Sequence, residues 1–120
     1  MSRITIVIPV YKTPDEWELM SLRQCCKVLG RYYVCLVAPV DLDTQSFHTI
    51  CSSYGVFLKE ERFSSEFFKN VQGYNRLLLS EDFYLRFREY DYMLIYQLDA
   101  YVFEDKLEEW CSLGYDYVGA

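Results

Sequence analysis

The sequence predicts an α/β fold, in which helices cover both faces of a Rossmann-like, mostly parallel sheet. Short apolar runs alternate along the chain with segments whose apolar residues recur at helical spacing. This alternation is typical of parallel strands joined by right-handed helical crossovers. The first run, residues 4–10, is almost continuously apolar and rich in β-branched residues, which indicates a strand that is covered on both faces.

A helix is predicted to follow the first strand after a short loop. Pro9 lacks a backbone donor and should end the strand. Thr13, Pro14 and Glu16 fit an N-cap, a first helical residue and a capping-box partner. Gly30 stands where a left-handed C-cap would end the helix. The apolar residues at helical spacing between these caps are Leu19, Leu22, Cys26 and Leu29.

The same pattern repeats in the middle of the chain. Residues 32–38 are apolar and predict a second strand, and residues 43–54 predict a short helix that Gly55 closes. Residues 56–58 predict a third strand. Residues 60–68 mix charged and aromatic residues without a clear period, so we expect a loop there. The residues expected to face inward from the short helix are Phe47, Ile50, Cys51 and Tyr54.

The remaining segments complete the alternation. Residues 70–79 and 81–90 have helical spacing, and residues 92–97, the most apolar run after the first, predict a fourth strand. Residues 105–112 predict a last helix and residues 115–118 a last strand. In parallel sheets of this kind, ligands bind beyond the carboxyl ends of the strands. Polar residues at those ends are therefore the first candidates for a site.

Composition and charge bound the function. The 120 residues are 52% hydrophobic and 25% charged, which predicts one packed domain over residues 1–120. A net charge of -6 disfavours a nucleic-acid partner. No apolar run reaches the roughly 20 residues of a transmembrane helix, and no signal peptide is evident, so we expect a cytoplasmic protein. The chain stops in or just past a predicted strand, which suggests a C-terminally truncated domain whose open sheet edge favours a homodimer.

Several chemically distinctive residues have a structural interpretation. The five cysteines show no CxxC spacing and are expected to be reduced core thiols. His48 is the only histidine and no GxSxG motif accompanies it, so a catalytic triad is disfavoured. The acidic residues from Glu104 to Glu109 fit the first turn of a helix. Trp17 and Trp110 are expected to pack in the core or against a helix, and a contact with a sugar is the alternative.

Candidate binding residues follow the first and fourth predicted strands. Neither GxGxxG nor GxxxxGK[ST] occurs, which disfavours ordinary dinucleotide and P-loop sites. Asp99, just after the fourth strand, suits a hard cation such as Mg²⁺ or Mn²⁺. An aspartate at a strand end is also a common cap or turn residue. Gln97 adds no second negative charge, so substrate phosphates would have to complete the metal site.

Two parts of the chain resemble known sequences. Residues 6–11 resemble the opening strand of glycosyltransferases with the A-type fold, which often ends I-P-x-Y-N, with Lys12 in place of the asparagine. Residues 96–103, 107–110 and 114–120 are similar to a family of uncharacterised glycosyltransferase-like domains with a Q-T-D triplet, an E-x-W helix and a Y-D-Y-I-G-A-P-W segment. That family normally continues beyond the position of Ala120.

The resemblance implies a nucleotide-sugar site. The nucleotide base and ribose would contact Pro9, Val10 and Tyr11, and Asp99 would match the metal-binding aspartate of a D-x-D motif whose first position is Gln97. Residues 69–76 resemble the helix that faces the donor, from which Asn75 or Arg76 could reach phosphate. Gly73 either permits a close backbone approach there or precedes a helix that starts at Asn75.

Two other functions stay open at this stage. A non-catalytic binding or assembly module would use the same α/β scaffold, and the missing second acid favours it. A different phosphate-handling enzyme could use Asp99 as a nucleophile or metal ligand. No residue can be assigned as catalytic base, because inverting members of the glycosyltransferase fold supply it from the later, acceptor-binding part.

Overall fold

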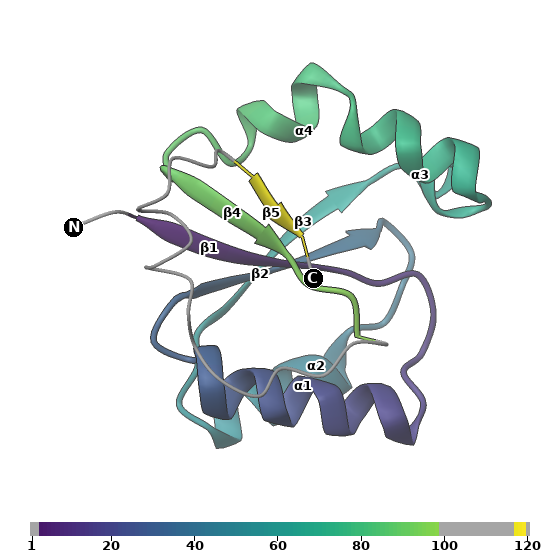
Figure 1. The fold of residues 1–120 in the computed structure, drawn as a ribbon. Helices are drawn as coiled ribbons and strands as arrows, with labels where there is room; N and C mark the ends of the chain where they lie inside the picture. Colours follow the sequence, from purple (N-terminus) through teal and green to yellow (C-terminus); the bar gives the residue numbers. More distant parts are fainter. Residues whose placement is uncertain (1–2, 99–116, 120) are drawn as a thin grey trace.

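The computed structural model describes residues 3–98 and 117–119. Within these residues, all strand pairs are parallel, and the strands form one sheet in the order β3-β2-β1-β4-β5. The predicted Rossmann-like α/β fold is therefore confirmed (Figure 1). The strands are β1 (Ile4–Pro9), β2 (Tyr33–Pro39), β3 (Leu58–Phe63), β4 (Tyr92–Ile95) and β5 (Tyr117–Gly119).

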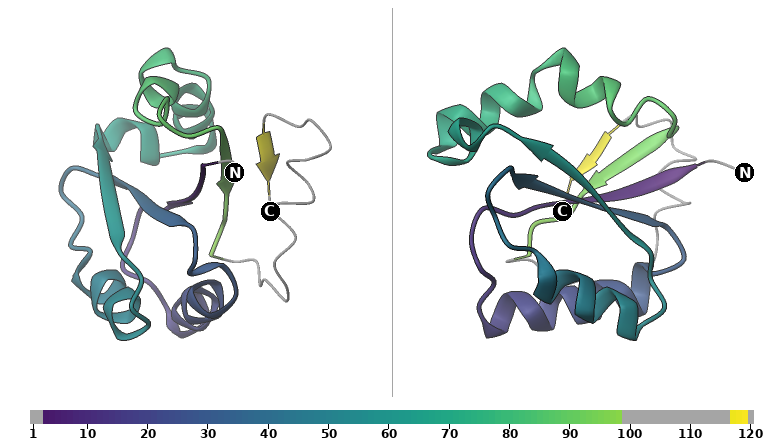
Figure 2. Two further views of the ribbon diagram at one scale, coloured as in Figure 1. Left: turned by 90° about the vertical axis from the view of Figure 1, so that its left-hand side faces the viewer. Right: turned by 180° about the vertical axis from the view of Figure 1, so that it is seen from behind.

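Helices cover the sheet on both sides, as Figures 1 and 2 show. Helices α1 (Glu16–Leu29) and α2 (Gln45–Ser53) lie on one face and connect β1, β2 and β3. The 3-10 helix η1 (Ser65–Phe68) and helices α3 (Val71–Leu78) and α4 (Glu81–Leu85) lead from β3 to the opposite face. The connection from β3 therefore crosses over the sheet to place β4 beside β1.

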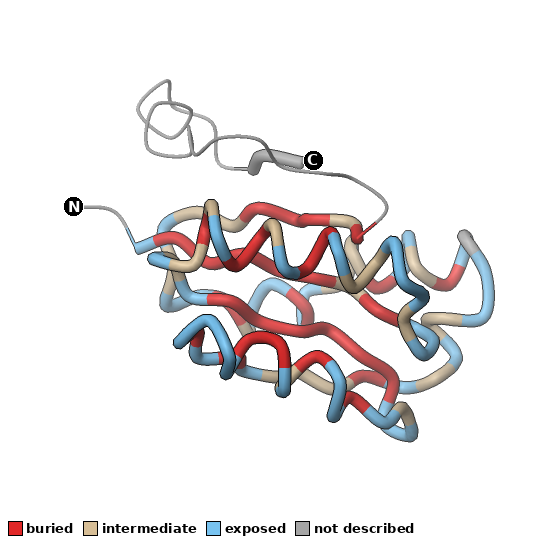
Figure 3. Tube along the Cα trace, turned by 90° about the horizontal axis from the view of Figure 1, so that it is seen from below, coloured by how far each residue is buried: buried red, intermediate tan, exposed pale blue. Residues whose placement is uncertain are grey.

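Alternation along β1 divides the core into two layers. Ile4, Ile6 and Ile8 belong to a cluster of 19 buried residues on the α1 and α2 face. Val7 points the other way and belongs to a cluster of eight on the α3 and α4 face. Successive side chains of a strand point to opposite faces, so one apolar run serves both layers. Figure 3 shows the buried residues continuing along the strands and the inner sides of the helices.

Helix α1 begins two residues later than predicted. Asp15 is the N-cap, and its Oδ1 accepts from Glu18 N at 2.8 Å while Glu18 Oε1 accepts from Asp15 N at 3.2 Å. The capping box is thus present with partners other than Thr13 and Glu16, because aspartate caps at least as well as threonine and has its own glutamate at the required spacing.

Two glycines end helices in different ways. Gly55 follows α2 with a φ of 70°, the left-handed conformation expected of a closing glycine. Gly30 has a φ of -66°, so the predicted left-handed cap of α1 is wrong. The chain leaves α1 through a right-handed turn in which Tyr32 N donates to Leu29 O at 3.1 Å.

The segment after α2 holds the largest difference from the sequence prediction. Residues 60–63, expected in a loop, belong to β3, and residues 65–68 form η1. Charges on this outer strand are neutralised in pairs: Glu60 with Arg62 at 2.5 Å on one face, and Glu61 with Arg86 at 3.4 Å on the other. Such pairing allows a charged sequence to form a strand. Tyr54, expected to face inward, is 38% exposed at the end of α2.

The segment before β4 is less helical than predicted. Helix α4 ends at Leu85, not at residue 90. Arg86 then turns toward the sheet, where its guanidinium lies 4.0 Å from the centre of the Phe63 ring and donates to Arg62 O at 2.7 Å. Strand β4 ends at Ile95, although Tyr96 N still donates to Val7 O at 2.8 Å. The predicted helix at residues 105–112 lies outside the described residues.

The described cysteines are buried free thiols, as expected for the core. Burial raises the pKa of Cys25 to about 12, with the neighbouring Cys26 adding to the shift. Burial also raises the pKa of Cys35 to about 12, with Glu61 contributing. These thiols are therefore neutral at physiological pH. Cys111 lies outside the described residues, as do Trp110 and the acidic residues from Glu104 to Glu109.

Each helix among the described residues is too short or too polar to cross a bilayer.

Candidate functional site

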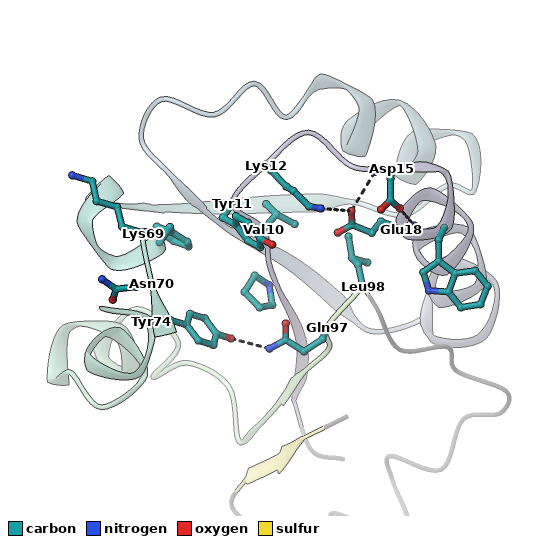
Figure 4. Close-up of a pocket in the computed structure, with 13 residues that line it drawn as sticks. Val10, Tyr11, Lys12, Asp15, Glu18, Lys69, Asn70, Tyr74, Gln97 and Leu98 are labelled. Atoms are coloured by element: carbon teal, nitrogen blue, oxygen red, sulfur yellow. Dashed lines mark hydrogen bonds and ion pairs between the residues drawn. The ribbon is translucent and has the colours of Figure 1, made fainter. Parts of the chain in front are cut away.

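A pocket of about 500 Å³ opens at the carboxyl ends of β1 and β4 (Figure 4). These two strands are neighbours in the sheet, but the connections that follow β1 and precede β4 run over opposite faces. Such a reversal leaves a crevice beyond the strand ends, where ligands of open α/β sheets bind. The described residues around it come from β1, α1, the end of β4, and the segment from η1 to α3.

The β1 side of the pocket contains the predicted Pro9, Val10 and Tyr11. Val10 is buried, and its N donates to Val37 O at 2.9 Å, so the chain stays tied to β2 beyond Pro9. Tyr11 is 62% exposed, and its ring points into the pocket in Figure 4. The structure thus presents a rigid backbone with one aromatic ring facing the space.

The α1 side of the pocket is acidic. Asp15 and Glu18 line it and also form the cap of α1, and Glu18 Oε1 lies 3.7 Å from Lys12 Nζ. Trp17 lines it as well and is 51% exposed, so it is not part of the core. Trp17 occupies the first turn of α1, which follows the capping Asp15.

Gln97, also predicted as a binding residue, is held at the end of β4. The preceding Tyr96 is fully buried, and its hydroxyl hydrogen-bonds Ser21 Oγ on α1 at 2.9 Å. Gln97 Nε2 donates to the hydroxyl of Tyr74 on α3 at 3.0 Å. Leu98 completes this side of the pocket. The end of β4 is therefore fastened to helices on both faces of the sheet.

The fourth side is formed by Phe68, Lys69, Asn70 and Tyr74. Asn70 caps α3 by accepting from Gly73 N at 2.7 Å. This start rules out a helix that begins only at Asn75.

Gly73 lies inside α3 and permits a close backbone approach, as one of its two interpretations predicted. A Cβ on Gly73 would lie 2.8 Å from Glu66 O and 3.3 Å from Phe67 Cα. The neighbour is η1 rather than a ligand. This contact sets the distance between η1 and α3, and with it the position of Tyr74.

Asn75 and Arg76 are exposed residues of α3 and do not line the pocket in the structure. Asn70 and Tyr74, which sequence reasoning missed, occupy that side instead. The signal was present in the sequence, because a cap at Asn70 places Tyr74 one turn later on the same side of the helix. Placing the start of α3 correctly would have identified both residues.

The predicted metal would need donor groups at the edge of this pocket. No group of three His, Cys, Asp or Glu side chains suited to a metal occurs among residues 3–98 and 117–119. The amide oxygen of Gln97 is a suitable donor for a hard cation, whereas Asp15 and Glu18 are engaged in the cap of α1. Asp99 lies outside the described residues and directly follows Leu98 of the pocket in sequence.

His48 lies elsewhere, in a polar network between α2 and β3. Its Nε2 is 2.5 Å from Glu60 Oε2, and Thr44 Oγ1 donates to the same carboxylate at 3.1 Å. Arg62 also donates to Pro39 O and Leu42 O, each at 2.7 Å. Burial alone would raise the pKa of Glu60, but the hydrogen bonds from His48 and Thr44 and the charge of Arg62 lower it overall. The network fastens the loop after β2 to β3.

Comparison with protein families places the chain. A family model described as "Protein of unknown function (DUF5672)" matches residues 57–120, more than half of the chain. The chain belongs to the DUF5672 family. Within the described residues, the match runs from the start of β3 through α3 and β4 and includes Tyr74 and Gln97 of the pocket. A comparison of the DUF5672 chain with curated proteins gave no match.

Proposed function

We propose that this DUF5672 protein binds a nucleotide diphosphate sugar in the pocket between β1 and β4 and takes part in glycosyl transfer from it. The observation that carries the proposal is the position of the pocket at the reversal point of the sheet. A volume of about 500 Å³ is within the range typical of small-molecule sites. The resemblance of residues 6–11 and 96–103 to glycosyltransferase sequences supports the choice of ligand.

The aromatic residues suit the nucleotide end of such a ligand. Tyr11, Phe68 and Tyr74 line the pocket together with Val10. A base can stack on an aromatic ring irrespective of its hydrogen-bonding pattern. We therefore assign the base and ribose to Pro9, Val10 and Tyr11, across from Tyr74.

The diphosphate requires positive charge from another source than the helix that follows β1. In dinucleotide-binding folds that helix N-terminus binds the diphosphate. Here its first turn contains Glu16 and Glu18 after the capping Asp15, and these carboxylates would repel phosphate. A divalent cation, Mn²⁺ or Mg²⁺, held by Asp99 would neutralise the diphosphate charge.

The first experiment is a thermal-shift screen with UDP, GDP, CMP and dTDP, with and without Mn²⁺. A ligand at ten times its dissociation constant stabilises the protein by about 1.4 kcal/mol, or several degrees. We expect a metal-dependent shift with one nucleotide that is lost in Asp99→Asn. Asp43→Asn is the matched control, because Asp43 is exposed, does not line the pocket, and accepts a hydrogen bond from the neighbouring Gln45 N. No shift with any nucleotide, from folded protein, would overturn the proposal.

A second candidate function is a binding module without transferase activity. The observation that favours it is that both carboxylates lining the described part of the pocket are engaged in the cap of α1. The two functions differ in turnover. Incubation with the matching nucleotide sugar and Mn²⁺ would release free nucleoside diphosphate if the chain transfers or hydrolyses the sugar. Binding without release would favour the module.

A further inference from the structure

Gln97 is held in place from two directions. Its backbone follows Tyr96, whose hydroxyl is hydrogen-bonded to Ser21 of α1 in the core. Its side-chain nitrogen donates to Tyr74 of α3 at 3.0 Å. The first hydrogen bond leads to α1 on one face of the sheet, and the second leads to α3 on the opposite face. Ordering a glutamine side chain costs rotamer entropy. Because the side chain of Gln97 is already ordered in the ligand-free protein, ligand binding does not incur this cost.

The tether to Tyr74 determines what Gln97 can offer a ligand. An amide has donors on nitrogen and acceptor lone pairs on oxygen. Because the nitrogen is directed to Tyr74, the oxygen faces into the pocket, as Figure 4 shows. Among the described residues, no group donates a hydrogen bond to this oxygen. The pocket therefore presents a neutral hydrogen-bond acceptor at the end of β4, which matches a donor and would repel a phosphate oxygen.

We infer that Gln97 Oε1 accepts a hydrogen bond from a hydroxyl or N–H group of the nucleotide, and that Tyr74 is a positioning residue that fixes this orientation. The inference rests on the proposed function, since it concerns the same pocket. It makes Gln97 a determinant of ligand selectivity and orientation. A purely structural tie between α3 and β4 is the competing explanation, and it would affect stability without discriminating among ligands.

The test begins with calorimetric titration of the nucleotide that binds among UDP, GDP, CMP and dTDP. One uncharged hydrogen bond contributes about tenfold or less to affinity. Gln97→Ala should weaken binding by about tenfold and Tyr74→Phe by about threefold to tenfold. In the Gln97→Ala background, Tyr74→Phe should have no further effect, because Tyr74 acts through Gln97. Tyr84→Phe on the neighbouring helix is the matched control and should leave affinity unchanged.

Ligand analogues identify the donor and require no variant. The wild type is titrated with the 2′-deoxy, 3′-deoxy and base-N-methylated forms of the same nucleotide. The form that lacks the donor should bind about tenfold more weakly, and the Tyr74→Phe penalty should vanish with that form alone. If a deoxy analogue shows both effects, the donor is a ribose hydroxyl. If the base-methylated analogue shows them, the donor is a base N–H.

Three results would overturn the inference while leaving nucleotide binding established: an unchanged affinity in Tyr74→Phe, full additivity with Gln97→Ala, or the same penalty with every analogue. Failure of all four nucleotides to bind would instead overturn the proposed function and this inference with it.

Discussion

The two faces of the sheet are built differently. Among the described residues, the α1 and α2 face has 19 buried residues in one cluster, most of them aliphatic or cysteine, under helices of 14 and 9 residues. The described part of the α3 and α4 face has eight, under helices of 8 and 5 residues. Because the pocket lies where the faces meet, one of its sides is backed by a large core and the other by a small one. We therefore expect the side of the pocket that is backed by the large core to stay fixed, and the side backed by the small core to adjust to a ligand.

Aromatic contacts partly compensate for the smaller cluster. Phe83 lies 5.9 Å from Phe63 and 5.2 Å from Phe87 between ring centres, distances at which aromatic pairs attract. The guanidinium of Arg86 lies over Phe63 and adds a cation–π contact. The short helices are therefore held by a few aromatic and cation–π contacts with preferred geometries, whereas α1 and α2 are held mainly by the packing of many aliphatic side chains.

The largest expected effect comes from truncating one matched leucine on each face. Leu22 of α1 and Leu77 of α3 are both fully buried. Leu22→Ala should reduce the free energy of unfolding by about 3–5 kcal/mol and Leu77→Ala by about 2–3 kcal/mol, since a cavity costs more where many neighbours hold its walls apart. Urea unfolding measures both. Equal losses, or a larger loss for Leu77→Ala, would contradict the difference between the faces.

Gly73→Ala tests the packing of the smaller face. Alanine favours a helix over glycine by about 1 kcal/mol, but its Cβ would meet the Glu66 carbonyl at 2.8 Å. Overpacking costs about 1–3 kcal/mol, so we expect a net loss of about 1 kcal/mol in urea unfolding and weaker nucleotide binding as Tyr74 shifts. A stabilised variant with unchanged affinity would show that η1 moves away freely.

The smallest effect concerns the charges on β3. The folded-state pKa of Glu60 is below its ordinary value of 4.5, so its ionised form stabilises the fold above about pH 4.5, and this contribution is lost as the pH falls through the folded-state pKa. Glu60→Gln should therefore be slightly less stable than wild type at pH 7, with a gap that closes under acid. Urea midpoints between pH 3 and 7 would show it. A gap independent of pH would contradict the assignment.

The elements that the sequence predicts best are those that are buried on both faces along their whole length. Strands β1 and β2 are covered on both faces, so nearly every position is apolar and the run is evident in the sequence. A third strand is predicted at residues 56–58, but residues 60–63 of β3 escaped prediction because Glu60 and Glu61 are neutralised by Arg62 and Arg86. The partner Arg86 is distant in sequence, and no local window contains it.

The candidate site was predictable to the extent that topology determines it. Tyr11 and Gln97 follow different strands, and parallel strands bring their carboxyl ends to one edge. The side chains on α3 depend on the rotation of a short helix, which the Asn70 cap and the contact of Gly73 with η1 determine. That contact joins two irregular segments, and neither has a periodic pattern from which it could be inferred.

The central place of β1 also affects how the protein folds. Ile6 pairs with Val34 on one side and with Leu94 on the other, and the second partner is roughly three times as far along the chain, so its loop closes at a greater entropic cost. We therefore expect β4 to dock late, after β1, α1, β2 and α2 have assembled. The pocket exists only once β4 has docked, and contacts that form after the transition state act on the unfolding rate. A bound ligand should accordingly prolong the lifetime of the native state and leave the folding rate nearly unchanged.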